Sequence, residues 1–89
     1  MYSGGVTNEL DQNLQDMPLY TLARLIKRDW KKPYFGAVPY LDAMSTLNSV
    51  NDKYGCDDGK SIVRYFLSNS TTWRGPIARA VKAELKKRI

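Results

Sequence analysis

Apolar residues recur at every third or fourth position through most of this 89-residue chain, and no segment shows sustained alternation of period two. Such spacing places apolar side chains on one face of a helix, whereas alternation would indicate strands. The pattern predicts an all-α fold, a small helical bundle of four helices. In one interpretation residues 7–15 add a short N-terminal helix. Residues 1–6, with two adjacent glycines, are expected to form a flexible tail, and residues 7–89 a single helical domain.

Local signals predict the limits of the four helices, which are residues 17–31, 39–49, 58–68 and a last helix from Trp73 or Pro76 to the C-terminus. Asp16 suits the N-cap of the first helix, and Pro33 ends it. A polar loop is expected over residues 51–59. The third helix is apolar around most of its circumference, so we expect it to be the central, buried one. Thr71 or Thr72 is expected to cap the last helix.

The charges fall into blocks of alternating sign that add up to a net charge of +5. The four blocks are residues 1–16 at −3, 17–32 at +4, 33–59 at −3 and 60–89 at +7. The first and last of the four predicted helices are therefore basic. Brought together, their cations would neutralise several phosphates, which indicates a nucleic-acid surface. The candidate contacts are Arg24, Lys27, Arg28, Lys31, Lys32, Arg74, Arg79, Lys82 and Lys86.

A simpler interpretation of these cations stays open. Many of them lie in the last turns of their helices, where positive charge compensates the helix dipole. Glu84 and Arg88 also have the spacing of a favourable ion pair within one helix. On this interpretation the basic residues form solvated faces, or they meet an acidic protein partner.

Aromatic residues interleave with lysines between the first two predicted helices. The candidate partner-binding residues are Trp30, Tyr34, Phe35 and Tyr40. Exposed rings would stack on unpaired bases or anchor a protein partner. The alternative is that they fill the corner between two helices as part of the core.

The sequence carries no pattern of catalytic residues, so we do not expect an enzyme. It contains no histidine, and its single cysteine, Cys56, has no base to activate it. The segment from Gly55 to Ser61 resembles a phosphate-binding loop but is one residue too short and carries Asp57 and Asp58. We interpret these two acids as favourable charges at a helix N-terminus. No cofactor, metal or small-molecule substrate is predicted.

The single cysteine and the N-terminal sequence indicate a cytoplasmic protein. One cysteine cannot form an internal disulfide, which favours a reducing compartment. The first residues lack the basic and apolar regions of a signal peptide. Apolar runs are also far shorter than the roughly 20 residues of a spanning helix, so no membrane contact is expected.

Two segments resemble small proteins encoded by tailed bacteriophages. They are Asp29-Trp30-Lys31-Lys32-Pro33-Tyr34-Phe35-Gly36-Ala37-Val38-Pro39-Tyr40 and Tyr65-Phe66-Leu67-Ser68-Asn69-Ser70-Thr71-Thr72-Trp73-Arg74-Gly75. The similarity extends from about Leu19 to the C-terminus. It assigns no activity, but it implies a role in the cytoplasm of a bacterial host, in handling nucleic acid or in binding a host protein. The leading hypothesis is a non-enzymatic protein that contacts nucleic acid through two basic helices; the alternative is a protein-interaction module that self-associates or modulates an acidic host protein.

Overall fold

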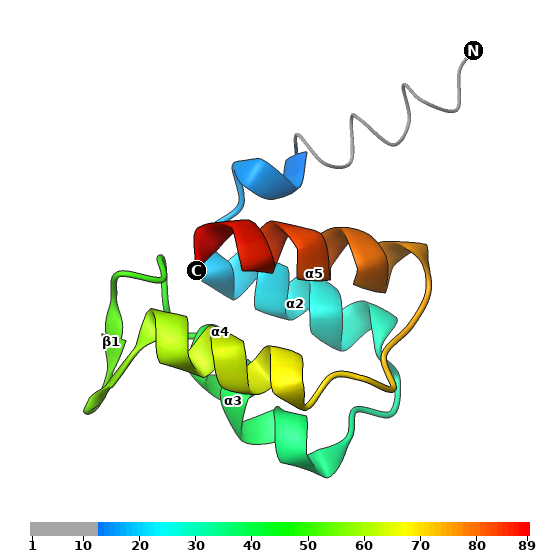
Figure 1. The fold of residues 1–89 in the computed structure, drawn as a ribbon, viewed down its shortest axis with the longest axis horizontal. Coiled ribbons are helices and arrows are strands. Elements are labelled where there is room, and N and C mark those ends of the chain that lie inside the picture. The colour runs from blue at the N-terminus through cyan, green and yellow to red at the C-terminus, as the bar shows by residue number, and fades with distance from the viewer. Residues whose placement is uncertain (1–12) are drawn as a thin grey trace.

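The computed structural model of this chain describes residues 13–89 (Figure 1). Its elements are, in order, α2 (Leu19–Asp29), the 3₁₀ helix η1 (Phe35–Ala37), α3 (Val38–Met44), β1 (Lys53–Tyr54), β2 (Asp57–Asp58), α4 (Gly59–Ser68) and α5 (Pro76–Arg88). The prediction of a mainly helical protein is confirmed. Of the short helix expected over residues 7–15, residues 13–15 are helical, and the remainder lies outside the described residues, as does the tail expected over residues 1–6.

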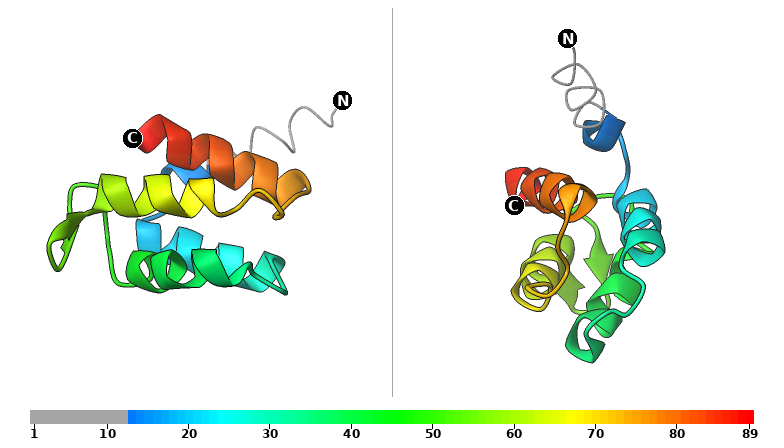
Figure 2. Two further views of the ribbon diagram at one scale, coloured as in Figure 1. Left: turned by 60° about the horizontal axis from the view of Figure 1, so that its bottom comes forward. Right: turned by 90° about the vertical axis from the view of Figure 1, so that its right-hand side faces the viewer.

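Helices α2, α3, α4 and α5 surround one apolar core (Figure 2). Helix α2 contacts α3 and α5, and α4 contacts the same two helices. Burial of apolar side chains between them is the main stabilising term. The largest fully buried side chains include Phe66, Leu14, Leu19, Leu22, Ile26, Leu41, Met44 and Leu85. No helix within residues 13–89 combines the length and the apolar character that crossing a membrane requires.

Helix α4 is amphipathic, so the expectation that it is the central helix is wrong. Ile62 and Phe66 face the core, but Tyr65 is half exposed and Arg64 is exposed. The ring of Tyr65 lies against Tyr40 of α3, with centroids 5.4 Å apart. One part of the Tyr65 side chain therefore packs on α3, and the rest is exposed to solvent. In the sequence, Tyr65 extends the apolar residues around most of the helix circumference, which is why burial was expected.

The segment after α3 caps the start of α2, which changes two expected helix limits. Helix α2 has no side-chain cap, so Asp16 is not the N-cap that the sequence predicted. The N–H groups of its first two residues donate instead to the carbonyl oxygens of Asn48 and Leu47, at 3.0 and 2.9 Å. These carbonyls satisfy donors that every helix start leaves free. The chain accordingly leaves α3 after Met44, before the expected end at Ser49.

Residues 51–59 contain a short antiparallel hairpin, which corrects both the expected irregular loop and the all-α prediction. The register pairs Lys53 with Asp58 and Tyr54 with Asp57. Gly55 lies in the turn with φ of +63°, where the absence of Cβ is an advantage. The strands have two exposed residues each. Strands this short have no periodicity from which the sequence could predict them.

Helix α5 begins at Pro76, and the predicted cap at Thr71 or Thr72 is wrong. The residue before the helix is Gly75, whose φ of +114° strongly favours glycine. Proline suits the first turn of a helix because it has no N–H to leave unpaired. The two threonines lie in the preceding turn, and no side chain caps α5.

Gly59 is the point where the hairpin joins α4, and it packs directly on the backbone of Val50. A Cβ atom there would lie 2.7 Å from the carbonyl oxygen of Val50 and 2.8 Å from its Cα. Because backbone would have to move, we expect Gly59→Ala to lower the free energy of unfolding by about 1–3 kcal/mol. Urea denaturation followed by circular dichroism measures this loss. Gly55→Asn, at a turn where Cβ would meet no atom within 4 Å, is the control. Equal losses for the two variants would contradict the assigned contact.

Candidate nucleic-acid interface

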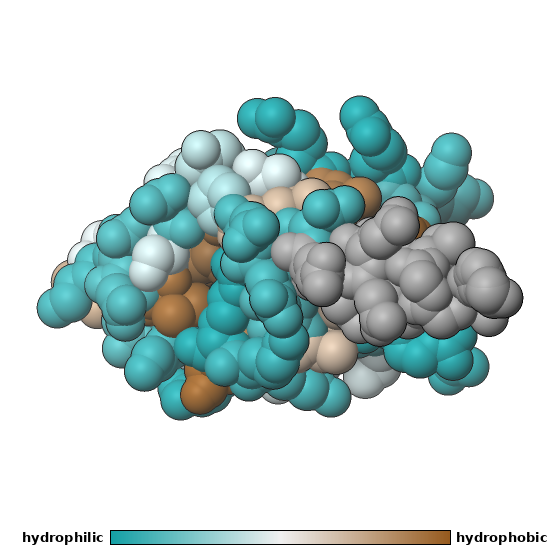
Figure 3. Space-filling model, turned by 90° about the horizontal axis from the view of Figure 1, so that it is seen from above, coloured by the Kyte–Doolittle hydropathy of each residue, from teal (hydrophilic) through white to brown (hydrophobic). Residues whose placement is uncertain are grey.

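The cations of α2 and those of α5 face different directions, although the two helices are neighbours. Arg24 and Arg28 are exposed on the side of α2 opposite the buried Leu19 and Ile26. Lys27 is exposed too, but its Nζ lies 3.1 Å from a carboxylate oxygen of Asp42 in α3. Seen from above α5, the described surface is mainly hydrophilic, with small hydrophobic areas between polar side chains (Figure 3). The fold therefore does not merge the two basic helices into one continuous stripe.

The cationic side of α5 borders the connection between α4 and α5. Arg79, Lys82 and Lys86 are spaced three and four residues apart, which places them on one side of the helix. The Nζ atom of Lys82 donates to the carbonyl oxygens of Ser70 and Trp73, each at 2.7 Å. Lys82 therefore satisfies the turn between α4 and α5, while Arg79 and Lys86 are exposed. Of the three predicted contacts on α5, Lys82 has a structural role as well.

The cations of this side are close enough to affect one another. Partial burial lowers the pKa of Lys82 most, and the nearby positive charges of Lys86 and Arg74 lower the pKa further. Like charges held together repel, and an anion placed between them offsets that repulsion. The positive charges of Arg74, Lys82 and Lys86 therefore lie near one another.

A hollow of about 280 Å³ opens at the start of α5. It is lined by Trp73, Arg74, Gly75, Ala78, Arg79 and Lys82. Three of these residues are cationic and none is acidic. The N-terminal end of the helix adds a partial positive charge to the same place. Three of the predicted contacts therefore lie around one depression of suitable charge for a phosphate group.

Helix α4 carries two exposed cations that the sequence analysis did not include among the candidate contacts. Tyr65 marks the side of α4 that faces α3. Lys60, Arg64 and Leu67 follow one another at spacings of four and three residues on another side of α4. Lys60 and Arg64 are exposed there. The same spacing was visible in the sequence, but the expectation of a fully buried α4 concealed it.

Trp30 belongs to the core, which corrects its prediction as a partner-binding residue. It is only 7% exposed, and its ring stacks on that of Trp73 with centroids 5.9 Å apart and planes 15° apart. Phe66 meets both indoles edge-on, at 6.3 Å from each. The Nε1 atom of Trp73 donates to the carboxylate of Asp29 at 2.9 Å. A ring enclosed in this way offers no surface to a partner.

The indole stack brings the two basic blocks of the sequence to the same end of the molecule. Lys31 and Lys32 directly follow Trp30, and Arg74 directly follows Trp73. All three cations are exposed. The connection from α2 to α3 and the connection from α4 to α5 meet at this end (Figure 1). The blocks therefore converge at the helix ends and not along the helix sides.

The other three predicted partner-binding aromatics differ in exposure. Tyr40 is partly buried against Tyr65. Tyr34 is 45% exposed, and Phe35 is 79% exposed. Their two rings lie together, with centroids 4.8 Å apart. Tyr34 and Phe35 are therefore the aromatics of the predicted set that a ligand can reach.

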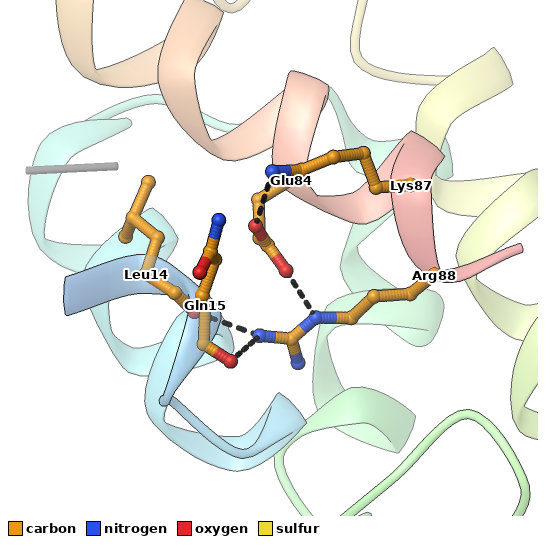
Figure 4. Close-up of polar contacts among 5 residues, drawn as sticks. All are labelled: Leu14, Gln15, Glu84, Lys87 and Arg88. Carbon is orange, nitrogen blue, oxygen red and sulfur yellow. Dashed lines mark hydrogen bonds and ion pairs between the residues drawn. The ribbon is translucent and has the colours of Figure 1, made fainter. Parts of the chain in front are cut away.

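The opposite side of α5 is occupied by a network that holds the N-terminal segment (Figure 4). The carboxylate of Glu84 accepts a hydrogen bond from Nε of Arg88 at 2.6 Å and lies 3.5 Å from Nζ of Lys87. The guanidinium of Arg88 also donates to the carbonyl oxygens of Leu14 and Gln15, at 2.7 and 3.2 Å. The predicted pair between Glu84 and Arg88 is confirmed, and these charges serve the fold.

The loop that resembles a phosphate-binding motif serves as a helix start. Asp58 is the N-cap of α4 and accepts a hydrogen bond from the N–H of Ser61 at 2.8 Å. This bond is the main cause of the lowered pKa of the Asp58 carboxyl. The interpretation of Asp58 as a favourable charge at a helix N-terminus is confirmed. Cys56 is an exposed free thiol in the hairpin turn. Within residues 13–89, no three histidine, cysteine or acidic side chains gather as metal ligands would.

Comparisons of this chain with protein-family models, with curated proteins and with solved structures find no match.

Proposed function

We propose that this protein binds nucleic acid by contacting the phosphate backbone through α5 and the segment before it. The observation that carries the proposal is a set of cations, Arg79, Lys82 and Lys86 on one side of α5 and Arg74 in the segment before it. The single acid of that helix, Glu84, is engaged on another side by Lys87 and Arg88. Cations held together in this way bind phosphates by releasing condensed counterions.

In this proposal the protein acts by binding alone and needs no cofactor and no reaction. The resemblance to phage-encoded proteins supports a place of action in the cytoplasm of a bacterial host. The cations of α2 have a secondary part, since Arg24 and Arg28 project elsewhere and Lys27 is paired with Asp42.

Salt dependence of binding tests the proposal. Four phosphate contacts predict that raising salt from about 50 to about 200 mM weakens binding roughly 50-fold for a single strand and 150-fold for a duplex. Fluorescence anisotropy with labelled DNA and RNA measures the affinity at each salt concentration. Absence of binding at the lower concentration would contradict the proposal.

Charge variants locate the contact surface. Arg79→Gln/Lys86→Gln removes two contacts, so we expect the slope of log affinity against log salt to become shallower by about 1.4 for a single strand and about 1.8 for a duplex. Lys53→Gln/Lys87→Gln lowers the net charge equally but away from this side, and should leave the slope nearly unchanged. Arg24→Gln/Arg28→Gln should also have a small effect. Equal effects of all three pairs would indicate attraction by net charge alone and would contradict a defined face.

A second candidate function is an interaction module that self-associates or binds an acidic host protein. It is favoured by the position of the exposed acids Asp52, Asp57 and Asp58 in and beside the hairpin, at the opposite end of the molecule from the converging cations (Figure 1). Charges of opposite sign at opposite ends permit head-to-tail association. Sedimentation velocity at low and high salt tests this: a salt-sensitive oligomer supports it, and a monomer at all concentrations opposes self-association.

A further inference from the structure

Phe35 is exposed in a place where its ring has no role in the fold. Among the described residues it is the most exposed large hydrophobic side chain, at 79%, whereas Ala37 of the same 3₁₀ turn is fully buried. Leaving an aromatic ring in water forgoes the stabilisation that burial would give. The turn therefore holds its backbone against the core and presents one ring outward.

The ring of Phe35 packs against a second aromatic ring, that of Tyr34. Tyr34 lies beside Phe35 with its ring plane tilted by 53°. The Tyr34 ring in turn packs so closely on Gly36 that a Cβ there would lie 2.6 Å from its Cε2 atom. The same Cβ would lie 2.9 Å from Oδ1 of Asn69, whose Nδ2 donates to the carbonyl oxygen of Tyr65. Gly36, on which the Tyr34 ring packs, thus lies close to Asn69 at the end of α4.

Cations flank this aromatic pair. Lys31 and Lys32 are exposed and are separated from Tyr34 only by Pro33, and Arg74 lies at the same end of the molecule. The one acid beside the indole stack, Asp29, accepts the hydrogen bond from Trp73. Within residues 13–89 no acidic side chain forms an ion pair with Lys31 or Lys32. An exposed ring next to these lysines matches a ligand that has both an aromatic face and negative charge. A nucleotide in a single strand has both.

We infer that Phe35, supported by Tyr34, stacks on an unpaired base of single-stranded nucleic acid while Lys31 and Lys32 neutralise adjacent phosphates. The inference rests on the proposed function and gives it a substrate class. Bases in a duplex are already stacked and paired, so a rigid ring at the end of a helical domain reaches only a base that is free.

Two oligomers of the same length separate stacking from charge: a labelled single strand of about 12 thymidines, and an abasic strand with the same phosphates. We expect the native protein to bind the thymidine strand about 5- to 150-fold more tightly, the range measured for one stacked base. Phe35→Ala should remove this preference and keep the salt slope, whereas Phe35→Trp should retain the preference. Tyr54→Ala, at a half-exposed tyrosine in the hairpin, is the matched control and should behave as native protein.

Three other outcomes would overturn the stacking inference. Salt-dependent binding that is equal for the two strands and unchanged by Phe35→Ala overturns the stacking inference and leaves the proposed function standing. No binding to either strand at low salt overturns both. A dimer in sedimentation that Phe35→Ala dissociates, without any effect on the base preference, assigns the ring to self-association and overturns the inference.

Discussion

Trp73→Ala is expected to lower the free energy of unfolding by about 3–5 kcal/mol. Stability of a domain is commonly about 5–15 kcal/mol in total, so this loss removes a large part of it. The indole stacks on Trp30, meets Phe66 edge-on and donates to Asp29. Its removal opens a cavity between α2, α4 and the start of α5. Urea denaturation followed by circular dichroism measures the loss.

Trp73→Phe separates the packing of the ring from its hydrogen bond. Phenylalanine keeps most of the stack but cannot donate to Asp29, so we expect a smaller loss of about 1–3 kcal/mol. If the alanine and phenylalanine variants were equally unstable, the hydrogen bond rather than the stack would hold this end together. If both were as stable as the native protein, the described packing would be contradicted.

Glu84→Ala is expected to lower the free energy of unfolding by about 2–3 kcal/mol. Glu84 is 6% exposed and accepts from Arg88, which then lies partly buried without its counter-charge. Breaking one partner of a fully buried pair costs about 3–5 kcal/mol, and the partial exposure of Arg88 reduces that figure. Arg88 also holds the carbonyl groups of Leu14 and Gln15. Hydrogen exchange should therefore accelerate at residues 13–17 together with the loss of stability.

Lys87→Ala is the matched control for this network. Its ammonium group contacts the same carboxylate, but 57% of its side chain is exposed, so the expected loss is below about 1 kcal/mol. A double-mutant cycle between Glu84→Ala and Arg88→Ala measures the coupling energy directly. A coupling near zero, or an effect of Lys87→Ala as large as that of Glu84→Ala, would contradict the assigned roles.

Helix periodicity predicted the longer elements because each of these helices buries one side. Leu22 and Ile26 of α2 and Val81 and Leu85 of α5 recur at the spacing that burial imposes. The ends of the helices were less predictable. Helix α2 receives its caps from carbonyl oxygens nearly thirty residues further along the chain, a contact that no local signal encodes. The hairpin was not predicted for a related reason. Each strand has only two residues, so their pairing depends on the turn between them and leaves no periodic pattern in the sequence.

The individual cations of the candidate site were predictable, but their directions were not. Helical spacing showed that Arg79 and Lys86 share a side of α5. Only the packing shows that this side lies beside the turn before α5, where Lys82 binds the carbonyl oxygens of Ser70 and Trp73. Exposure was equally hidden within the aromatic segment. The sequence shows rings near lysines, and tertiary contacts decide which ring is enclosed and which reaches solvent.

The segments of residues 29–40 and 65–75 lie against each other in the fold. Trp30 of the first stacks on Trp73 of the second, and Tyr40 lies against Tyr65. Together they form the end of the molecule where the basic blocks converge. The candidate interface therefore lies next to the most buried aromatic cluster of the described residues. Tight packing of that cluster fixes the backbone that carries the cations and Phe35.

The most direct test of the account follows amide chemical shifts of isotope-labelled protein as a single-stranded oligonucleotide is added. We predict that the largest changes fall on residues 74–86 and on the connection that carries Lys31 and Phe35. Amides beside Arg24 on the outer side of α2 should move little. Changes centred on α2, with α5 unaffected, would contradict the account, and so would an absence of changes at low salt.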